Sequence, residues 1–314
     1  MIITLQDTET REISAKIDEL HEERGEAALG RVLTLLISTN EAELEHDLEV
    51  ANNASREHPC RVIAVAPSSR KISPEEEHPT FLDAEIRFGS DAGAGEIIVL
   101  RPRGGLVRHA DTLVIPLLVP DAPVVAWWPN EAPANLSKDL LGSMASSRIT
   151  DAMHSSNPRR TMDDLRRNRS AKDVDMSWTR LTVWRAMIAS MLDQPHLPVS
   201  NVRVTGQKDY LPLDLLAAWL RLRLNVPVMI EEDPNATAVT GVYLTRGDGV
   251  LSLERPSTDD GFAVISVPGQ SPQTISVPAR TLEECLSEEL GRLYPDEIYS
   301  EVVSQGLDLV KPRQ

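Results

Sequence analysis

A small basic group is the first part of this 314-residue chain that suggests ligand binding. Arg101, Arg103 and His109 follow an apolar segment, and guanidinium groups bind phosphate well. A solvated surface loop has the same appearance, because the basic residues are few and two glycines separate them. The group is therefore a candidate phosphate site, with an ordinary loop as the alternative.

A second candidate is the apolar run at residues 124–129, which ends in Trp127, Trp128 and Pro129. Proline cannot donate to a continuing ladder, so the run predicts a buried strand that ends here. In open α/β sheets, ligands and partners bind at the carboxyl ends of strands. Successive strand side chains point to opposite faces, so at least one tryptophan is expected near a surface, a crevice or a domain junction. The alternative is that both rings close one domain core.

The sequence signatures of cofactor, metal and nucleophile sites are missing. There is no dinucleotide or P-loop glycine fingerprint and no G-x-S-x-G elbow. Residues 89–95 are rich in glycine, but they follow an alternating strand and include Asp91, which would repel phosphate. The seven histidines have no metal-ligand spacing. We therefore predict no cofactor, no metal and no catalytic residue.

The net charge and the cysteines narrow the expected binding partners and the expected cellular compartment. The formal net charge is −16, which argues against non-specific binding to nucleic acid or to an anionic membrane. No apolar run reaches the ~20 residues of a membrane span, and the N-terminus lacks the features of a signal peptide. Cys60 and Cys285 are far apart and are expected to be small core residues. A disulfide between them is the alternative, but a reduced, cytoplasmic protein is the prediction.

Hydrophobic periodicity in the first half predicts an α/β domain with a mainly parallel or mixed sheet flanked by helices. The expected strands are residues 31–38, 60–66, 82–88, 97–100 and 124–128. The expected helices are residues 12–29, 40–57 and 136–147, with Asn40 as a cap, and residues 106–118 are expected to hold a short helix and a further strand.

The second half predicts an α+β domain with a mainly antiparallel sheet and packed helices. Its expected helices are residues 178–192, 215–224 with Asn225 at the end, and 281–293. Its expected strands are residues 202–204 and 226–230, a hairpin around the 247–249 turn, and two more strands joined by a turn at 269–272.

We place domain boundaries at residues 1–150 and 175–314, with a basic connector at residues 151–174. Residues 148–172 carry seven basic and three acidic side chains and few large apolar ones. The arginines of this segment either engage an acidic partner or balance the chain's own excess of carboxylates.

Three motifs of the chain are the most specific: residues 117–133 with their Trp-Trp-Pro, residues 148–152, and residues 175–182 followed by Trp184-Arg185. They are accompanied, in other parts of the chain, by residues 58–61, 82–85, 93–95, 215–219 and 281–299. Through these segments, and over essentially its whole length, the chain resembles the OpcA family of glucose-6-phosphate dehydrogenase assembly proteins.

The resemblance implies a non-enzymatic activator that binds glucose-6-phosphate dehydrogenase and promotes its active oligomer. It would thereby support NADPH production in the oxidative pentose phosphate pathway. It also suggests redox control through cysteines in photosynthetic members, a feature that Cys60 and Cys285 do not favour here. The competing functions are a sensor or enzyme of phosphorylated sugars at Arg101, Arg103 and His109, and a purely structural scaffold. No prediction is made about self-association.

Tryptophan and arginine dominate interface hot spots, so we predict a patch that binds the partner or lies at the domain junction. Its members are Trp127, Trp128, Pro129, Arg148, Asp151, Trp178, Arg180 and Arg185. In the alternative, the two tryptophan motifs pack on each other and lock the domains, and Arg148 and Asp151 form a structural ion pair.

Overall fold

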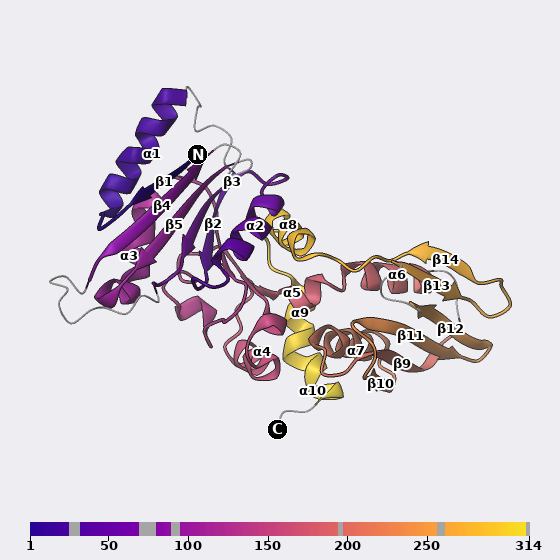
Figure 1. The fold of residues 1–314 in the computed structure, drawn as a ribbon. Coiled ribbons are helices and arrows are strands. Elements are labelled where there is room, and N and C mark those ends of the chain that lie inside the picture. Colours follow the sequence, from indigo (N-terminus) through magenta and orange to yellow (C-terminus); the bar gives the residue numbers. More distant parts are fainter. Residues whose placement is uncertain (25–31, 69–79, 89–94, 194–196, 256–260, 312–314) are drawn as a thin grey trace. The chain divides into compact units, whose positions relative to one another are not determined.

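The computed structural model describes residues 1–24, 32–68, 80–88, 95–193, 197–255 and 261–311 (Figure 1). The chain divides into two compact units. The first is Met1–Ser156, Asn168–Asp173 and Leu282–Pro295, and the second is Asn157–Arg167, Val174–Thr281 and Asp296–Gln314. This division differs from the predicted contiguous one, because the chain returns to the first unit after building most of the second.

An eight-stranded mixed sheet forms the first unit, in the order β1-β4-β5-β3-β2-β6-β7-β8. Its strands are β1 (Ile2–Leu5), β2 (Leu33–Ser38), β3 (Cys60–Val65), β4 (Leu82–Phe88), β5 (Glu96–Pro102), β6 (Val124–Trp128), β7 (Ser147–Thr150) and β8 (Asp173–Asp175). Neighbours from β5 to β7 pair in parallel, whereas β4 is antiparallel to both β1 and β5. The predicted mixed sheet is confirmed, and β1, β7 and β8 were not predicted.

The strand order places a switch point in the middle of this sheet. From β2 the chain passes through α2 (Leu44–Ala54) to β3 on one side, and β6 later pairs with β2 on its other side. Counting from β2 and leaving out the antiparallel β4, the order β5-β3-β2-β6-β7-β8 is 3-2-1-4-5-6. That is the order of doubly wound dinucleotide-binding sheets, whose ligands bind at the carboxyl ends beside the switch point.

Helices cover both faces of this sheet, which explains why β2 and β5 are almost wholly buried. Figure 1 shows α2 and α8 (Leu282–Gly291) on one face and α1 (Thr10–Arg24) and α3 (Ala110–Val114) on the other. The predicted strand within residues 106–118 is wrong. The chain there is helical from η2 (Gly104–His109) through α3 to η3 (Ile115–Leu117), and Leu113, Val114 and Leu117 are buried at helical spacing.

Two further predictions in this unit fail because short polar side chains bind the backbone locally. Asp139 Oδ1 accepts hydrogen bonds from the N–H groups of Leu141 and Gly142, so residues 136–147 form η4 (Leu136–Lys138) and turns, not a helix. Asn40 Oδ1 accepts from Ala42 and Glu43 at 2.8 and 3.1 Å, which forms a turn, and α2 begins only at Leu44.

A six-stranded sheet forms the second unit, in the order β10-β9-β11-β12-β13-β14. Its strands are β9 (Val199–Gln207), β10 (Val228–Asp233), β11 (Val239–Arg246), β12 (Gly249–Glu254), β13 (Phe262–Ser266) and β14 (Gln273–Ser276). Only the β9–β10 pair is parallel, in agreement with the predicted mainly antiparallel sheet. Its helical elements are α4 (Pro158–Arg167), α5 (Met176–Thr179), α6 (Thr182–Asp193), α7 (Leu211–Leu224), α9 (Glu297–Glu301), the π-helix η6 (Val302–Gly306) and α10 (Leu307–Val310).

The segment predicted as a basic connector, residues 151–174, contains the helix α4. Helix α4 buries Met162 and Leu165, and its Arg166 is buried as well. The Arg166 guanidinium donates to the Val303 carbonyl at 2.8 Å and pairs with Asp308 at 2.7 Å, so its charge is neutralised within the unit. The predicted helix at residues 178–192 is two helices, α5 and α6. Asn225 ends α7 as predicted, in the left-handed conformation with φ of 52°.

Candidate functional site

The Trp-Trp-Pro motif lies inside the first unit. Trp127 and Trp128 on β6 are 0% and 2% exposed, and Pro129 is also buried. The two rings project to opposite faces of the strand, as the pleat requires. A Cβ on Gly142 would lie 1.9 Å from the Leu136 carbonyl oxygen and 3.1 Å from Trp128, so the 139–144 turn packs directly on this ring. Neither tryptophan lies on an open surface.

Arg148 of β7 is a buried cation with a full set of partners. Its Nε donates to Asp173 at 2.5 Å, and Nη2 donates to Ser170 Oγ at 2.9 Å. Its Nη1 donates to the carbonyl groups of Gly142 and Ala145 at 3.3 and 3.4 Å. Arg148 pairs with Asp173, not with Asp151 as the alternative interpretation expected, and it holds the turn beneath Trp128.

The carboxyl ends of β2, β6 and β7 bring together a polar cluster at the switch point. Thr39, which follows β2, donates its hydroxyl to the Asp47 carboxylate of α2. Asn130, which follows β6, donates to the same Asp47 oxygen at 3.4 Å. After β7, Asp151 is fully buried and forms an ion pair with His154 at 2.9 Å, while the His154 side chain is 47% exposed. We call these five residues the switch-point cluster.

Asp47 is the most perturbed acid of the cluster. It is 1% exposed, and this burial raises the pKa of its carboxyl to about 6. The hydrogen bond from Thr39 and the charges of His46 and His154 act in the opposite direction on that pKa, and Glu43 acts with burial. The cluster therefore combines a buried carboxyl group of raised pKa with a half-exposed imidazole.

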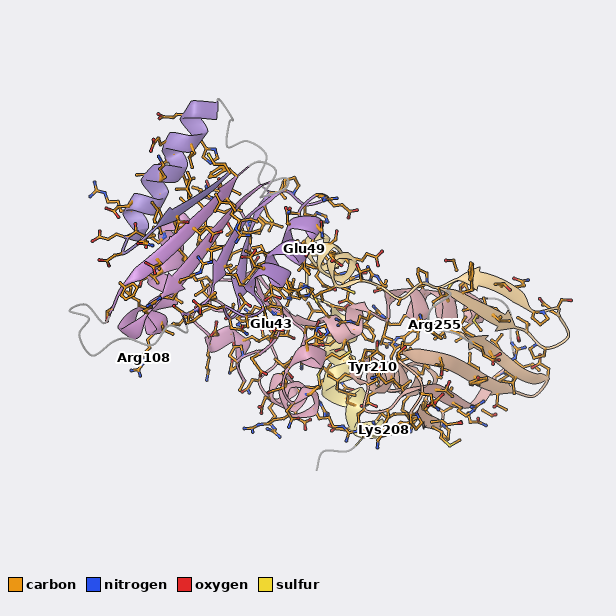
Figure 2. All side chains as sticks on the ribbon, viewed as in Figure 1. Glu43, Glu49, Arg108, Lys208, Tyr210 and Arg255 are labelled. Carbon is orange, nitrogen blue, oxygen red and sulfur yellow. The ribbon has the colours of Figure 1, made fainter. Side chains whose placement is uncertain are left out.

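The first crossover of this sheet is built unlike a pyrophosphate site. A phosphate site needs bare backbone N–H groups at the start of the helix, usually in a glycine-rich turn. Here the N–H groups of Ala42 and Glu43 already donate to Asn40. Glu43 lies at the start of α2 and Glu49 further along it, both exposed (Figure 2), and Asp47 is buried behind them. The exposed Glu43 carboxylate at the helix start repels a phosphate.

The Trp178 motif is organised within the second unit. Asp175 caps α5 by accepting from the Ser177 N–H at 2.9 Å, and Trp178 is fully buried. The indole N–H of Trp178 donates to Asp296 at 2.9 Å. The Arg185 guanidinium stacks on the Trp178 ring at 3.7 Å, so the structure brings these two predicted residues together. Arg180, just after α5, is half-buried.

The two arginines of the predicted phosphate site lie beside carboxylates of β4. Arg101 pairs with Glu85 at 3.2 Å. Arg103 is 7% exposed, lies over the Phe81 ring at 4.5 Å and is 4.0 Å from Asp83. His109 is exposed at the end of η2, and no ion pair or hydrogen bond among the described residues joins it to either arginine. The three side chains do not form one anion cradle.

A cavity of about 460 Å³ in the second unit is also internally neutralised. Asp214 at its wall pairs with Lys311 at 2.7 Å, and Lys311 lies 3.2 Å from Glu232. Burial raises the pKa of Asp214, and Lys311 counteracts this shift. The cavity thus presents paired charges to solvent and no unbalanced group for a ligand.

The described histidines, acids and cysteines outside these regions form no metal or redox site. Among the described residues, no group of three or more His, Cys, Asp or Glu side chains is placed to hold a metal ion. Cys60 and Cys285 are buried, and burial raises the pKa of the Cys60 thiol to about 12, which disfavours the thiolate that redox exchange needs. Within the described chain, no helix is long and apolar enough to cross a membrane.

Sequence reasoning identified Asp151 but not Thr39, Asp47, Asn130 or His154. The available signal was a polar residue directly after two predicted strands, at Thr39 and Asn130. Their convergence on Asp47 depends on the pairing of β2 with β6, which the sequence alone does not specify.

Two family models match the chain in order, and both describe a glucose-6-phosphate dehydrogenase subunit. Residues 51–167 match the N-terminal domain of that subunit, and residues 171–303 match its C-terminal domain. A search of curated proteins found no match.

Several solved oxidoreductases are distantly similar in fold. One from Sinorhizobium meliloti has a TM-score of 0.49 at 10% identity, with 90% of this chain and 96% of that chain covered. KijD10, a 3-ketoreductase from Actinomadura kijaniata, has a TM-score of 0.46 at 10% identity, with 89% and 96% covered. Similarity at this level carries no argument about activity.

Proposed function

Because the chain belongs to the OpcA family of glucose-6-phosphate dehydrogenase assembly proteins, we propose that it is a non-catalytic protein that binds this dehydrogenase. In the proposal it promotes the active oligomer of the enzyme and so supports NADPH production by the oxidative pentose phosphate pathway. Such a partner shifts an equilibrium only through its higher affinity for the active form.

The observation that carries the proposal is the ordered match of both domain models across residues 51–167 and 171–303. The geometry of the switch point supports it. A sheet with the strand order of a dinucleotide-binding fold has acidic side chains and occupied N–H groups where a pyrophosphate would bind. This edge is therefore better suited to bind a protein partner than a dinucleotide.

We place the contact with the dehydrogenase at the carboxyl edge of the first unit's sheet. The buried members of the predicted patch, Trp127, Trp128, Arg148 and Asp151, would position this edge. The contact itself would be made by the exposed side chains beside them, Glu43, His46 and His154. The half-buried Arg180 and Arg185 remain candidates for a second contact, which the buried Trp178 would position.

The test is to mix the purified chain with glucose-6-phosphate dehydrogenase at micromolar concentration and to measure turnover and the mass of the complex by light scattering. Activation together with a larger complex is the expected result. If neither quantity changes, the proposal fails. Binding without a change in turnover would make the chain a scaffold.

A pair of histidine variants locates the contact. His154→Ala should weaken the complex, because it removes the half-exposed side chain of the switch-point cluster. The matched control is His109→Ala, which removes an exposed histidine of the same unit far along the chain at the end of η2. Equal effects of the two substitutions would contradict this placement.

The competing sensor function has its own test. If glucose 6-phosphate or NADPH alone raises the melting temperature of the chain, a small-molecule site exists. Abolition of that shift by Arg103→Met would assign the site to the Arg101, Arg103 and His109 region. We expect no shift with either compound, because β4 already neutralises both arginines.

A further inference from the structure

Asp47 is a buried carboxylate at the carboxyl edge of the first unit's sheet, and it lacks a countercharge. It is 1% exposed, and in the part of the chain that the structure describes no lysine or arginine pairs with it. Both of its described hydrogen bonds, from Thr39 and Asn130, reach the same oxygen, Oδ2. No described residue donates to Oδ1. Buried carboxylates are normally paired with a cation, so Asp47 has an oxygen left for a donor that the described chain does not supply.

Other buried carboxylates of this unit do have an ion-pair partner. Glu96, which is fully buried, pairs with Arg61. Asp151, which belongs to the same switch-point cluster, pairs with His154 at 2.9 Å. The unit therefore neutralises buried carboxylates as a rule, and the missing countercharge of Asp47 is a departure that needs a cause.

The surface beside Asp47 is also acidic. Glu43 directly precedes α2 and is exposed (Figure 2), and Glu131, the residue after Asn130, is exposed as well. The basic groups that act on Asp47 are the imidazoles of His46 and His154, which carry a charge only when they are protonated. At neutral pH this edge attracts a cation, and the described residues next to Asp47 include no permanent one.

We propose that the carboxyl edge receives a cationic side chain, an arginine or a lysine, of the protein partner, and that this side chain donates to Asp47 Oδ1. The inference rests on the proposed function, because it names the group of the dehydrogenase that meets this edge. Only 1% of Asp47 reaches the surface, so the group must be long and narrow, as these two side chains are. Arginine fits best, because its planar guanidinium can donate to Asp47 and to Glu43 at once and is weakly hydrated.

The first measurement is the dissociation constant of the complex with glucose-6-phosphate dehydrogenase at neutral pH. Asp47→Asn removes the charge and keeps the shape of the side chain, so the dissociation constant should rise at least about tenfold. Glu43→Gln removes an exposed charge at the rim and should raise it by only about twofold to threefold. Asp18→Asn, at an exposed position of α1, is the matched control and should leave it unchanged. Circular dichroism should show that every variant is folded.

Salt separates a charge contact from a change of shape. The wild-type complex should weaken between about 0.05 and about 0.5 M NaCl, and the Asp47→Asn complex should weaken less over the same range. The wild-type complex should also weaken as pH falls from about 7 to about 5, because Asp47 gains a proton and His46 and His154 gain charge. Asp47→Asn should remove part of this pH dependence and leave the part that comes from the histidines.

An Asp47→Asn chain that binds the dehydrogenase as tightly as the wild type would overturn the inference. Equal salt dependence of the two complexes would overturn it too. In both cases the proposed function survives, because the wild-type chain still binds and activates the enzyme. The absence of any complex with the wild-type chain is a failure of the proposed function itself, and the inference fails with it. A melting temperature of the chain alone that rises with L-arginine amide, without a complex, would make the site one for a free cation.

Discussion

The sheets of the two units differ in where their polar and exposed side chains lie. In the first unit, helices cover both faces, and polar side chains gather at the carboxyl edge around Asp47 and Asp151. In the second unit, the strands themselves carry exposed apolar side chains, at Met229 on β10, Val250 on β12 and Phe262 on β13. A parallel sheet buried on both sides can bind only at its strand ends, whereas an antiparallel sheet can bind through a face.

The two units also differ in how they neutralise a buried arginine. Arg148 in the first unit is neutralised by Asp173. Arg255 in the second unit is 3% exposed and donates to the carbonyl groups of Val277 and Val239 at 3.3 and 3.0 Å, close to Trp184. No described carboxylate pairs with Arg255. Substituting Arg148 and Arg255 in turn can therefore test how much each unit depends on its buried arginine.

The largest expected effect is the loss of the Trp128 ring. Trp128→Ala should destabilise the first unit by about 3–5 kcal/mol, because it leaves a cavity against the turn at Gly142. Phe262→Ala, at an exposed position of the second unit, should change stability by no more than about 0.5 kcal/mol. Urea unfolding followed by circular dichroism measures both. A Trp128→Ala protein of normal stability that no longer binds the dehydrogenase would instead make Trp128 a contact residue.

Arg148→Met is expected to be nearly as damaging, at about 3–5 kcal/mol. The substitution leaves Asp173 without its cation and the carbonyl groups of Gly142 and Ala145 without their donor. Adding Asp173→Asn removes the uncompensated charge and should recover part of the loss in the same urea unfolding experiment. If the double variant is no more stable than the single one, the ion pair contributes little and the packing of the side chain dominates.

The sequence predicted the parts of the fold that depend on local patterns. A strand buried on both faces is a continuous apolar run, which identified β2, β3, β5 and β6. A strand buried on one face alternates apolar and polar residues, which identified β4. The non-contiguous units were missed, because the return of α8 to pack on α2 is a tertiary contact with no local signal.

The candidate site was predicted only in part, for a related reason. Asp151 follows a strand and was identified by motif, but its pairing with His154 and the convergence of Thr39 and Asn130 on Asp47 depend on strand order. Trp127 and Trp128 were correctly placed on a strand end. Their exposure was not predictable, because the turn that covers Trp128 is formed by residues 139–144, where a helix was expected.

Asp47 makes the stability of the first unit depend on pH. The folded pKa of about 6 lies above the ordinary value of 3.8, so between these values the folded state binds more protons than the unfolded state. Stability therefore falls as pH rises from about 4 to 6, and the full cost persists above that window. At about 1.4 kcal/mol per pKa unit, the cost is at most about 3 kcal/mol.

Asp47→Asn removes this titration while keeping an oxygen that accepts from Thr39. Relative to the wild type, the variant should gain stability as pH rises from 4 to 7, which urea unfolding at each pH measures. Taking the difference cancels the other titrating groups, and the exposed Asp18→Asn is the control. A difference that does not vary with pH would show that Asp47 is already well solvated.

The smallest of these effects is expected at Arg255, the counterpart of Arg148. Burial lowers the pKa of the Arg255 guanidinium, since the charge has lost water without gaining a described carboxylate. Arg255→Met removes that buried charge and leaves two carbonyl groups without donors, so we expect a loss of only about 1–2 kcal/mol. Methionine also retains the contact with Trp184. A loss as large as that of Arg148→Met would mean that Arg255 organises its unit as Arg148 does, and that the two units neutralise buried cations alike.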